Sequence, residues 1–201
     1  MQQENQMQKT GKTVGVYSAK ECAYLAAFVA LVIALQLAFS AVPGVELVTV
    51  CFVSYSFAMG AKRGMIAATA FTLVRQLIFG FFATVLILYL VYFNLLALTF
   101  GLLGTRASIK RRHLIWLIII ACLGTAFFTV FDNILTPIWY GYSKRAVKAY
   151  FMASLSFMAP QLICTAVSVG VLFLPLVKVF FMAKRTLVAR PHYQKPPNDK
   201  K

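Results

Sequence analysis

Residues 22–42, with the sequence CAYLAAFVALVIALQLAFSAV, decide the fold class, because they contain no charged residue and their most polar members are Gln36 and Ser40. A helix rises about 1.5 Å per residue, so about twenty apolar residues cross the hydrocarbon core of a bilayer. Pro43 and Gly44 follow directly and end the stretch, since proline cannot continue the helical hydrogen bonds and glycine allows a turn. The sequence therefore predicts a transmembrane helix here.

Five further apolar stretches follow along the chain. They cover residues 45–59, 65–80, 84–104, 114–133 and 154–182. The apolar run from 65 to 104 is too long for one span, so we expect a break near Gly80, which two phenylalanines follow. The polar and aromatic segment 134–152 is expected to be a connector outside the last two spans.

The composition agrees with this series of spans. Of the 201 residues, 61% are apolar and 12% are charged, whereas a soluble domain has about a quarter of its residues charged. Such a chain lacks the polar residues to cover a globule of its own size. We therefore expect an all-α membrane protein with six transmembrane helices in a domain of residues 20–182, between a polar tail 1–19 and a basic tail 183–201.

The basic charge of the chain is explained mainly by topology. Lysine and arginine total 20 against 5 acidic residues, which gives a formal net charge of +15. With a cytoplasmic N-terminus, sixteen of these cations fall in segments that face the cytoplasm and three in outer loops. This asymmetry follows the positive-inside rule and predicts that both termini are cytoplasmic, in a bacterial plasma membrane. The inner cations suit anionic lipids, and no basic face remains that would indicate a nucleic-acid partner.

Arg75 is the cation that topology does not explain, because it lies near the middle of the predicted third span. An arginine at that depth costs from about 3 to more than about 10 kcal/mol unless it faces a partner or a water-filled cavity. Glu46 and Asp132 lie at the outer ends of other spans, within reach of a long side chain. Two interpretations stay open, a structural ion pair that fixes helix packing or a cavity that opens to the outside.

Other polar and aromatic residues fall on the same outer half, and a few polar groups among aromatic rings are typical of a small-molecule pocket. The candidate substrate-binding residues are Glu46, Arg75, Tyr89, Tyr92, Asn94, Asp132, Asn133, Trp139 and Gln161. An interfacial aromatic belt is the alternative for Trp139. Hydrogen bonding to neighbouring helices is the alternative for the two asparagines, because an amide in hydrocarbon needs a partner.

Alanines recur at a spacing of four in the first stretch. On a helix this spacing places small side chains in one stripe, which allows close approach of another helix. The residues of this kind that we expect to dock a partner are Ala23, Ala26, Ala27 and Ala30. Packing of the same stripe inside the six-helix bundle is the alternative.

The sequence shows no set of catalytic or metal-binding residues. Both histidines lie in basic segments, and neither H-E-x-x-H nor G-x-S-x-G occurs. The four cysteines lie singly in apolar stretches, where a thiol behaves as a small buried hydrophobe. We therefore expect no enzyme activity, no metal and no cofactor.

Three features together resemble the substrate-binding membrane subunit (S component) of an energy-coupling factor (ECF) vitamin transporter, over residues 20–182. The alanine stripe resembles the A-x-x-x-A docking motif of that family. The segment 42–48, VPGVELV, is similar to the P-N-V-E-type stretch between its first two helices, with Gly44 in place of the more usual asparagine. Glycine-rich breaks and basic inner loops after the second and fourth spans also fit the pattern.

The resemblance implies a function. An S component binds a vitamin or cofactor precursor in its outer half, and cobalamin, pyridoxine-like and pyrimidine compounds are all candidates here. It docks through its first helix onto a transmembrane coupling subunit, which is carried by two cytosolic ATPases. The chain has no G-x-x-x-x-G-K-[ST] phosphate loop, so ATP would be used by the partners. The alternatives are a stand-alone secondary carrier and a non-catalytic membrane protein that serves assembly.

Overall fold

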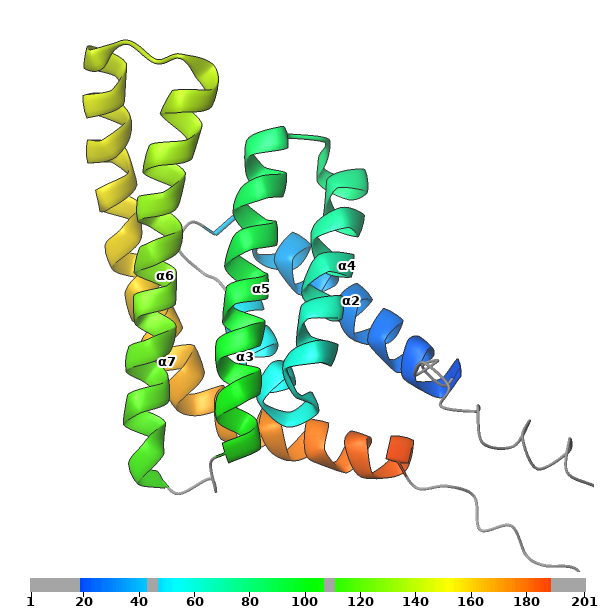
Figure 1. Cartoon of the computed structure of the whole chain (residues 1–201). Coiled ribbons are helices and arrows are strands. Elements are labelled where there is room, and N and C mark those ends of the chain that lie inside the picture. Colours follow the sequence, from blue (N-terminus) through cyan, green and yellow to red (C-terminus); the bar gives the residue numbers. More distant parts are fainter. Residues whose placement is uncertain (1–18, 43–46, 107–110, 189–201) are drawn as a thin grey trace, which may run out of the picture.

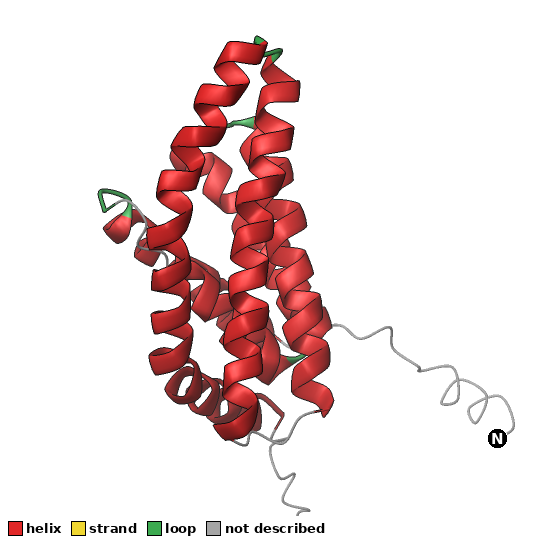
Figure 2. Cartoon of the chain, turned by 90° about the vertical axis from the view of Figure 1, so that its left-hand side faces the viewer, coloured by secondary structure: helices red, strands yellow, loops and turns green. Residues whose placement is uncertain are grey.

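The structure, a computed structural model, describes residues 19–42, 47–106 and 111–188. These residues form helices joined by short connections and contain no strand (Figures 1 and 2). The six helices are α2 (Ala19–Phe39), α3 (Val48–Met59), α4 (Ala61–Phe79), α5 (Ala83–Arg106), α6 (Arg111–Tyr140) and α7 (Lys144–Val188). The all-α prediction is confirmed, whereas the predictions for Glu46, for Gly44 and for the segments 1–18 and 189–201 lie outside the described residues.

Helix α3 forms the centre of the bundle, because all twelve of its residues are buried. It packs against α2, α4, α5 and α7. The Phe52 ring lies 5.4 Å from that of Phe28 in α2, 5.2 Å from Phe71 in α4 and 4.8 Å from Phe93 in α5, measured between centroids. Twelve residues rise only about 18 Å. Helix α3 is therefore too short to cross a bilayer alone, and it supplies the core around which the longer helices pack.

Four helices are long and apolar enough to cross a membrane, judged by length and composition alone. They cover Ala19–Phe39, Ala83–Gly104, Leu114–Tyr140 and Lys144–Leu187. Helix α4 carries Lys62, Arg63 and Arg75, and it does not join this set. The described chain is thus a helical membrane protein by these criteria, and six spans with cytoplasmic termini stay a prediction.

The exposed faces of these helices are apolar. Leu77 is 85% exposed, Ile138 75% and Trp116 66%, and many other large apolar side chains share this position. A soluble monomer rarely exposes so much contiguous apolar surface. Lipid chains are the environment in which these faces are stable.

The helices alternate in direction, so that their connections gather at two ends. The turns at residues 80–82 and 141–143 lie at the upper end in Figure 1. The turn at Gly60, the beginning of α2 and the last turns of α7 lie toward the lower end. This grouping agrees with the alternation expected between outer and inner segments.

The predicted connector 134–152 is wrong. Helix α6 continues to Tyr140, helix α7 begins at Lys144, and only residues 141–143 separate them. Pro137 lies inside α6, and membrane helices in general tolerate proline where neighbouring groups satisfy the freed carbonyl. Helix α7 also runs past the expected boundary at residue 182.

Helix α7 is the longest helix and contains Pro160 and Pro175. Its C-terminal part turns and runs across the lower end of the bundle (Figure 1). A sharp bend in a helix usually occurs at a proline, which removes one hydrogen bond and clashes with the preceding turn. The bend lets one helix line the upper half of the bundle and also close its lower end.

Glycines allow the close contact between α5 and the α3–α4 turn. Gly60 separates α3 from α4 with φ 95°, a conformation that side chains other than hydrogen disfavour. A Cβ atom on Gly101 would meet the backbone of Ala61, and one on Gly104 would meet the backbone of Phe57. These glycines hold the lower halves of α3, α4 and α5 in one tightly packed unit.

Candidate functional site

Three adjoining pockets form a cavity, called here the interhelical cavity, in the half of the bundle nearer the turns at 80–82 and 141–143. Their volumes are about 380, 330 and 240 Å³. Phe128 lines all three pockets, and Arg75 and Tyr89 line the two larger ones. Asp132 lines the second and third pockets, and Gln161 lines the first and third. Four of the nine predicted site residues therefore border one cavity.

The guanidinium of Arg75 is fixed on three sides. Its Nε donates a hydrogen bond to Gln36 Oε1 at 3.2 Å. The guanidinium carbon lies 4.4 Å from the ring centroid of Tyr89 and 4.9 Å from that of Phe79. Such cation–π contacts contribute about 0.5–2 kcal/mol each, more where water is excluded. The side chain is held in place by uncharged groups, and its positive charge is not cancelled by them.

Gln36 connects three helices at the cavity. While its Oε1 accepts from Arg75 in α4, its Nε2 donates to the Tyr89 hydroxyl in α5 at 3.2 Å. Gln36 is the amide within the first apolar stretch, and it was not among the predicted site residues. Its isolation among apolar residues was the available signal, because an amide in a membrane helix needs partners.

The carboxylate of Asp132 is bound by hydroxyl groups. Thr136 Oγ1 donates to one oxygen at 2.7 Å, and the Tyr150 hydroxyl donates to the other at 2.6 Å. The structure contains no ion pair between Arg75 and Asp132, although both line the second pocket. Of the two ion pairs expected for Arg75, the one with Asp132 is thus absent, and the one with Glu46 involves a residue outside the described part of the chain.

Aromatic rings form much of the remaining wall. The Phe128 ring lies 5.8 Å from that of Tyr89, and Phe157 from α7 lines two of the pockets. Phe128, Phe157 and Tyr150 were not among the predicted site residues. A phenylalanine in an apolar helix gives no signal of its own, because only the packing decides whether it faces a cavity, the core or lipid.

Four predicted site residues lie elsewhere. Tyr92 is only 1% exposed, and its hydroxyl shares a hydrogen bond with Thr49 at 3.1 Å inside the core. Asn94 lies in a shallow apolar groove on the outer face of α4 and α5, where its Nδ2 donates to the Leu90 carbonyl at 2.8 Å. The side-chain oxygen of Asn133 is buried without a hydrogen-bond partner among the described residues, and Trp139 is half exposed.

Helical geometry explains why the two asparagines separate from the residues that line the cavity. Successive residues of a helix point about 100° apart, and only residues three or four apart share a face. Asn94 follows Tyr89 by five positions, and Asn133 follows Asp132 by one. The predicted site residues share an expected depth in the membrane, whereas the direction of each side chain also decides whether it faces the cavity.

The alanine stripe lies on the face of α2 that points away from the bundle. Ala23, Ala26, Ala27 and Ala30 are all exposed. The opposite face of the helix buries larger side chains, which are Phe28, Val29, Val32 and Ile33. In the described chain the small residues therefore do not pack inside the bundle. They form an exposed helical face with short side chains.

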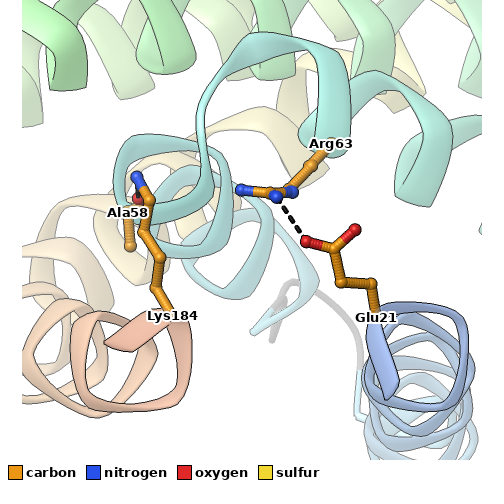
Figure 3. Close-up of polar contacts among 4 residues, drawn as sticks. All are labelled: Glu21, Ala58, Arg63 and Lys184. Atoms are coloured by element: carbon orange, nitrogen blue, oxygen red, sulfur yellow. Dashed lines mark hydrogen bonds and ion pairs between the residues drawn. The ribbon is translucent and has the colours of Figure 1, made fainter. Parts of the chain in front are cut away.

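Charged groups at the lower end pair with the protein itself (Figure 3). Arg63 in α4 forms an ion pair with Glu21 in α2. Lys184 in α7 donates to the carbonyl of Ala58 in α3 at 2.7 Å. These contacts join the beginning of α2 and the end of α7 to the central helices, and they give two of the predicted inner cations a structural role.

The described residues contain no group of three or more histidine, cysteine, aspartate or glutamate side chains arranged to hold a metal ion. Comparison of the chain with protein-family models, with curated proteins and with solved structures gave no match.

Proposed function

We propose that the chain is the substrate-binding subunit of an ATP-driven ECF-type importer in the bacterial plasma membrane. In this role it captures a vitamin or cofactor precursor from outside the cell. The observation that carries the proposal is the interhelical cavity, where an arginine and aromatic rings line a space at the predicted outer end of the bundle. A few charged or polar groups among aromatic rings are typical of a small-molecule pocket.

The exposed face of α2 supports the second part of the proposal. An importer subunit without its own ATPase needs a surface for the transmembrane coupling subunit, and the exposed alanines allow another helix to approach closely. This face lies opposite the buried side of α2, so a partner can bind there without entering the bundle. The two cytosolic ATPases would then act through the coupling subunit, and the chain itself would catalyse no reaction.

The dimensions of the separate pockets favour the smaller of the candidate substrates. Their volumes of about 380, 330 and 240 Å³ are each near or below the lower end of the range for small-molecule sites, which is about 300–1,000 Å³, so a larger compound would have to extend over all three pockets. Pyridoxine-like and pyrimidine compounds, with one ring each, suit this size. A corrinoid such as cobalamin is several times larger and fits the proposal less well.

Binding and uptake test the proposal separately. The purified chain alone should bind a labelled pyridoxine-like or pyrimidine compound at sub-micromolar concentration. Cells that produce the chain should accumulate that compound only when the coupling subunit and both ATPases are produced with it. Accumulation by the chain alone, without dependence on ATP, would contradict the proposal and favour a secondary carrier.

A further inference from the structure

The positive charge of Arg75 lacks a counter-charge within the described chain. Among the described residues only its Nε is hydrogen bonded, and the acceptor is the neutral amide of Gln36. The ion pair that the described residues contain joins Arg63 to Glu21, at the other end of the bundle. Within the described part of the chain the two terminal nitrogens of Arg75 thus keep their donors, and these nitrogens form the edge of the guanidinium that recognises carboxylate or phosphate groups through two parallel hydrogen bonds.

Asp132 brings the opposite charge to the same cavity. It borders the second pocket together with Arg75, and the third pocket without it. Each of its oxygens accepts one hydrogen bond from a hydroxyl group, and an ionised carboxylate accepts about four in all. The carboxylate therefore keeps capacity for further donors, and an N–H group is the complementary partner.

The wall that joins these two charges is aromatic. Tyr89 borders both pockets that Arg75 lines, and Phe128 borders these and the Asp132 pocket as well. The faces of such rings favour stacked or edge-on contact with another flat ring. Arg75 and Asp132 line one pocket and form no ion pair with each other. A compound that lies along this aromatic wall can therefore contact both of them.

On the basis of the proposed function, we infer that the interhelical cavity binds a small planar ring compound that carries an acid group and an N–H donor. The acid group, a carboxylate or a phosphate, lies against the terminal nitrogens of Arg75. The N–H donor points to Asp132, and the ring stacks against Tyr89 and Phe128. Arg75 selects the acid by charge as well as by hydrogen bonding, because the side chain is half-buried and opposite charges attract each other more strongly near a protein than in bulk water.

Matched pairs of compounds test this inference on the purified chain in lipid nanodiscs. We would use 4-aminobenzoate with 4-aminobenzamide, orotate with uracil, and pyridoxamine 5′-phosphate with pyridoxamine, so that the second member of each pair lacks the acid group. Calorimetry should detect binding of at least one acid, and its partner compound should bind at least about tenfold more weakly, since a charge-assisted hydrogen bond contributes about 1.5–3 kcal/mol.

Variants identify the residue responsible. Arg75→Gln should lower the affinity for the bound acid at least about tenfold and leave that for its acid-free partner nearly unchanged. Arg185→Gln makes the same chemical change at an exposed position of α7 and should bind the acid normally. If Arg75→Gln does not fold, Arg75→Lys keeps the charge without the planar fork and should show a partial loss.

Three results would overturn the inference: equal affinity for both members of the pair that binds, normal binding of the acid by both Arg75 variants, or no binding of any of the three acids at millimolar concentration. The proposed function would survive each of these results if another compound is imported in an ATP-dependent way. Conversely, uptake without the ATPases would contradict the proposed function and leave the ligand class intact.

Discussion

Helix α2 is joined to α4 by a polar contact near each of its ends, and the two contacts differ in charge. At the lower end the carboxylate of Glu21 meets the guanidinium of Arg63, so both charges are used within the protein. At the upper end the amide of Gln36 meets the guanidinium of Arg75. A neutral acceptor orients that group and leaves its charge available. The same side-chain type is therefore paired with a carboxylate at one end of α2 and with a neutral amide at the other, where we propose that it binds substrate.

The largest effect is expected on the face of α2 between these two contacts. Ala27→Trp places a bulky ring on the exposed alanine stripe, where it should prevent close approach of the proposed coupling subunit. Uptake in cells that contain all partner subunits should be abolished, while the purified variant should bind substrate with unchanged affinity. Transport assays and calorimetry on the same variant measure the two outcomes.

Ile115→Trp is a suitable control for that experiment, because Ile115 is an exposed apolar residue of α6. It introduces the same ring on another helix and should transport normally. Loss of folding in Ala27→Trp would instead indicate that the stripe packs against the protein itself.

The second largest effect is expected for Arg75, and it tests whether this arginine binds substrate while Arg63 has only a structural role. Arg75→Ala should lower substrate affinity by about 10- to 100-fold, because it removes a charged hydrogen-bonding partner. Its melting temperature should change little, since loss of the Gln36 and ring contacts is offset by removal of a half-buried charge that forms no ion pair among the described residues. Unchanged affinity together with lowered stability would assign Arg75 a structural role, for instance as a partner of Glu46.

The third prediction concerns Gln36→Glu, which makes the contact at the upper end an ion pair like the one at the lower end. The substitution replaces the side-chain amide by a carboxylate and so gives Arg75 a charged partner. Affinity for an acidic substrate should fall about tenfold, because an internal anion now competes for the guanidinium. Stability should be unchanged or higher.

Gln36→Met controls for the loss of orientation, because it removes the acceptor without adding charge. It should lower the affinity only a few-fold. An equal loss in both variants would show that Gln36 acts by positioning Arg75, and that the neutrality of the contact has no importance.

The sequence predicted the parts of the fold that depend on local pattern. The break at Gly80 and the helices on both sides of it agree with prediction within a few residues, because α4 ends at Phe79 and α5 begins at Ala83. The connector 134–152 failed because Pro137 and its polar neighbours were interpreted as a loop. Proline ends a helix in water more readily than in a membrane, where neighbouring groups and the absence of competing water preserve the helix.

The site was predictable where a residue contrasts with its surroundings. Arg75 and Asp132 stand out as charges within or next to apolar stretches, and both line the cavity. Phe128, which borders all three pockets, has no such contrast. Its role depends on the orientation of α6 relative to α5 and α7, which is a property of tertiary packing and is absent from local sequence.

The smallest effect is expected for Glu21→Gln at the lower end. This substitution replaces the carboxylate that Arg63 contacts by an amide, as in the contact of Arg75 with Gln36. The two side chains of the ion pair keep 28% (Arg63) and 17% (Glu21) of their surface exposed, so solvent screens the interaction. We expect a loss of about 0.5–1 kcal/mol in the free energy of unfolding and no change in substrate affinity. Denaturation of the variant in detergent and calorimetry with the bound substrate measure the two quantities.

A loss of affinity as large as that of Gln36→Glu would mean that the two ends of α2 are coupled. Arg63 and Arg75 would then depend on each other, and they would not have separate structural and binding roles.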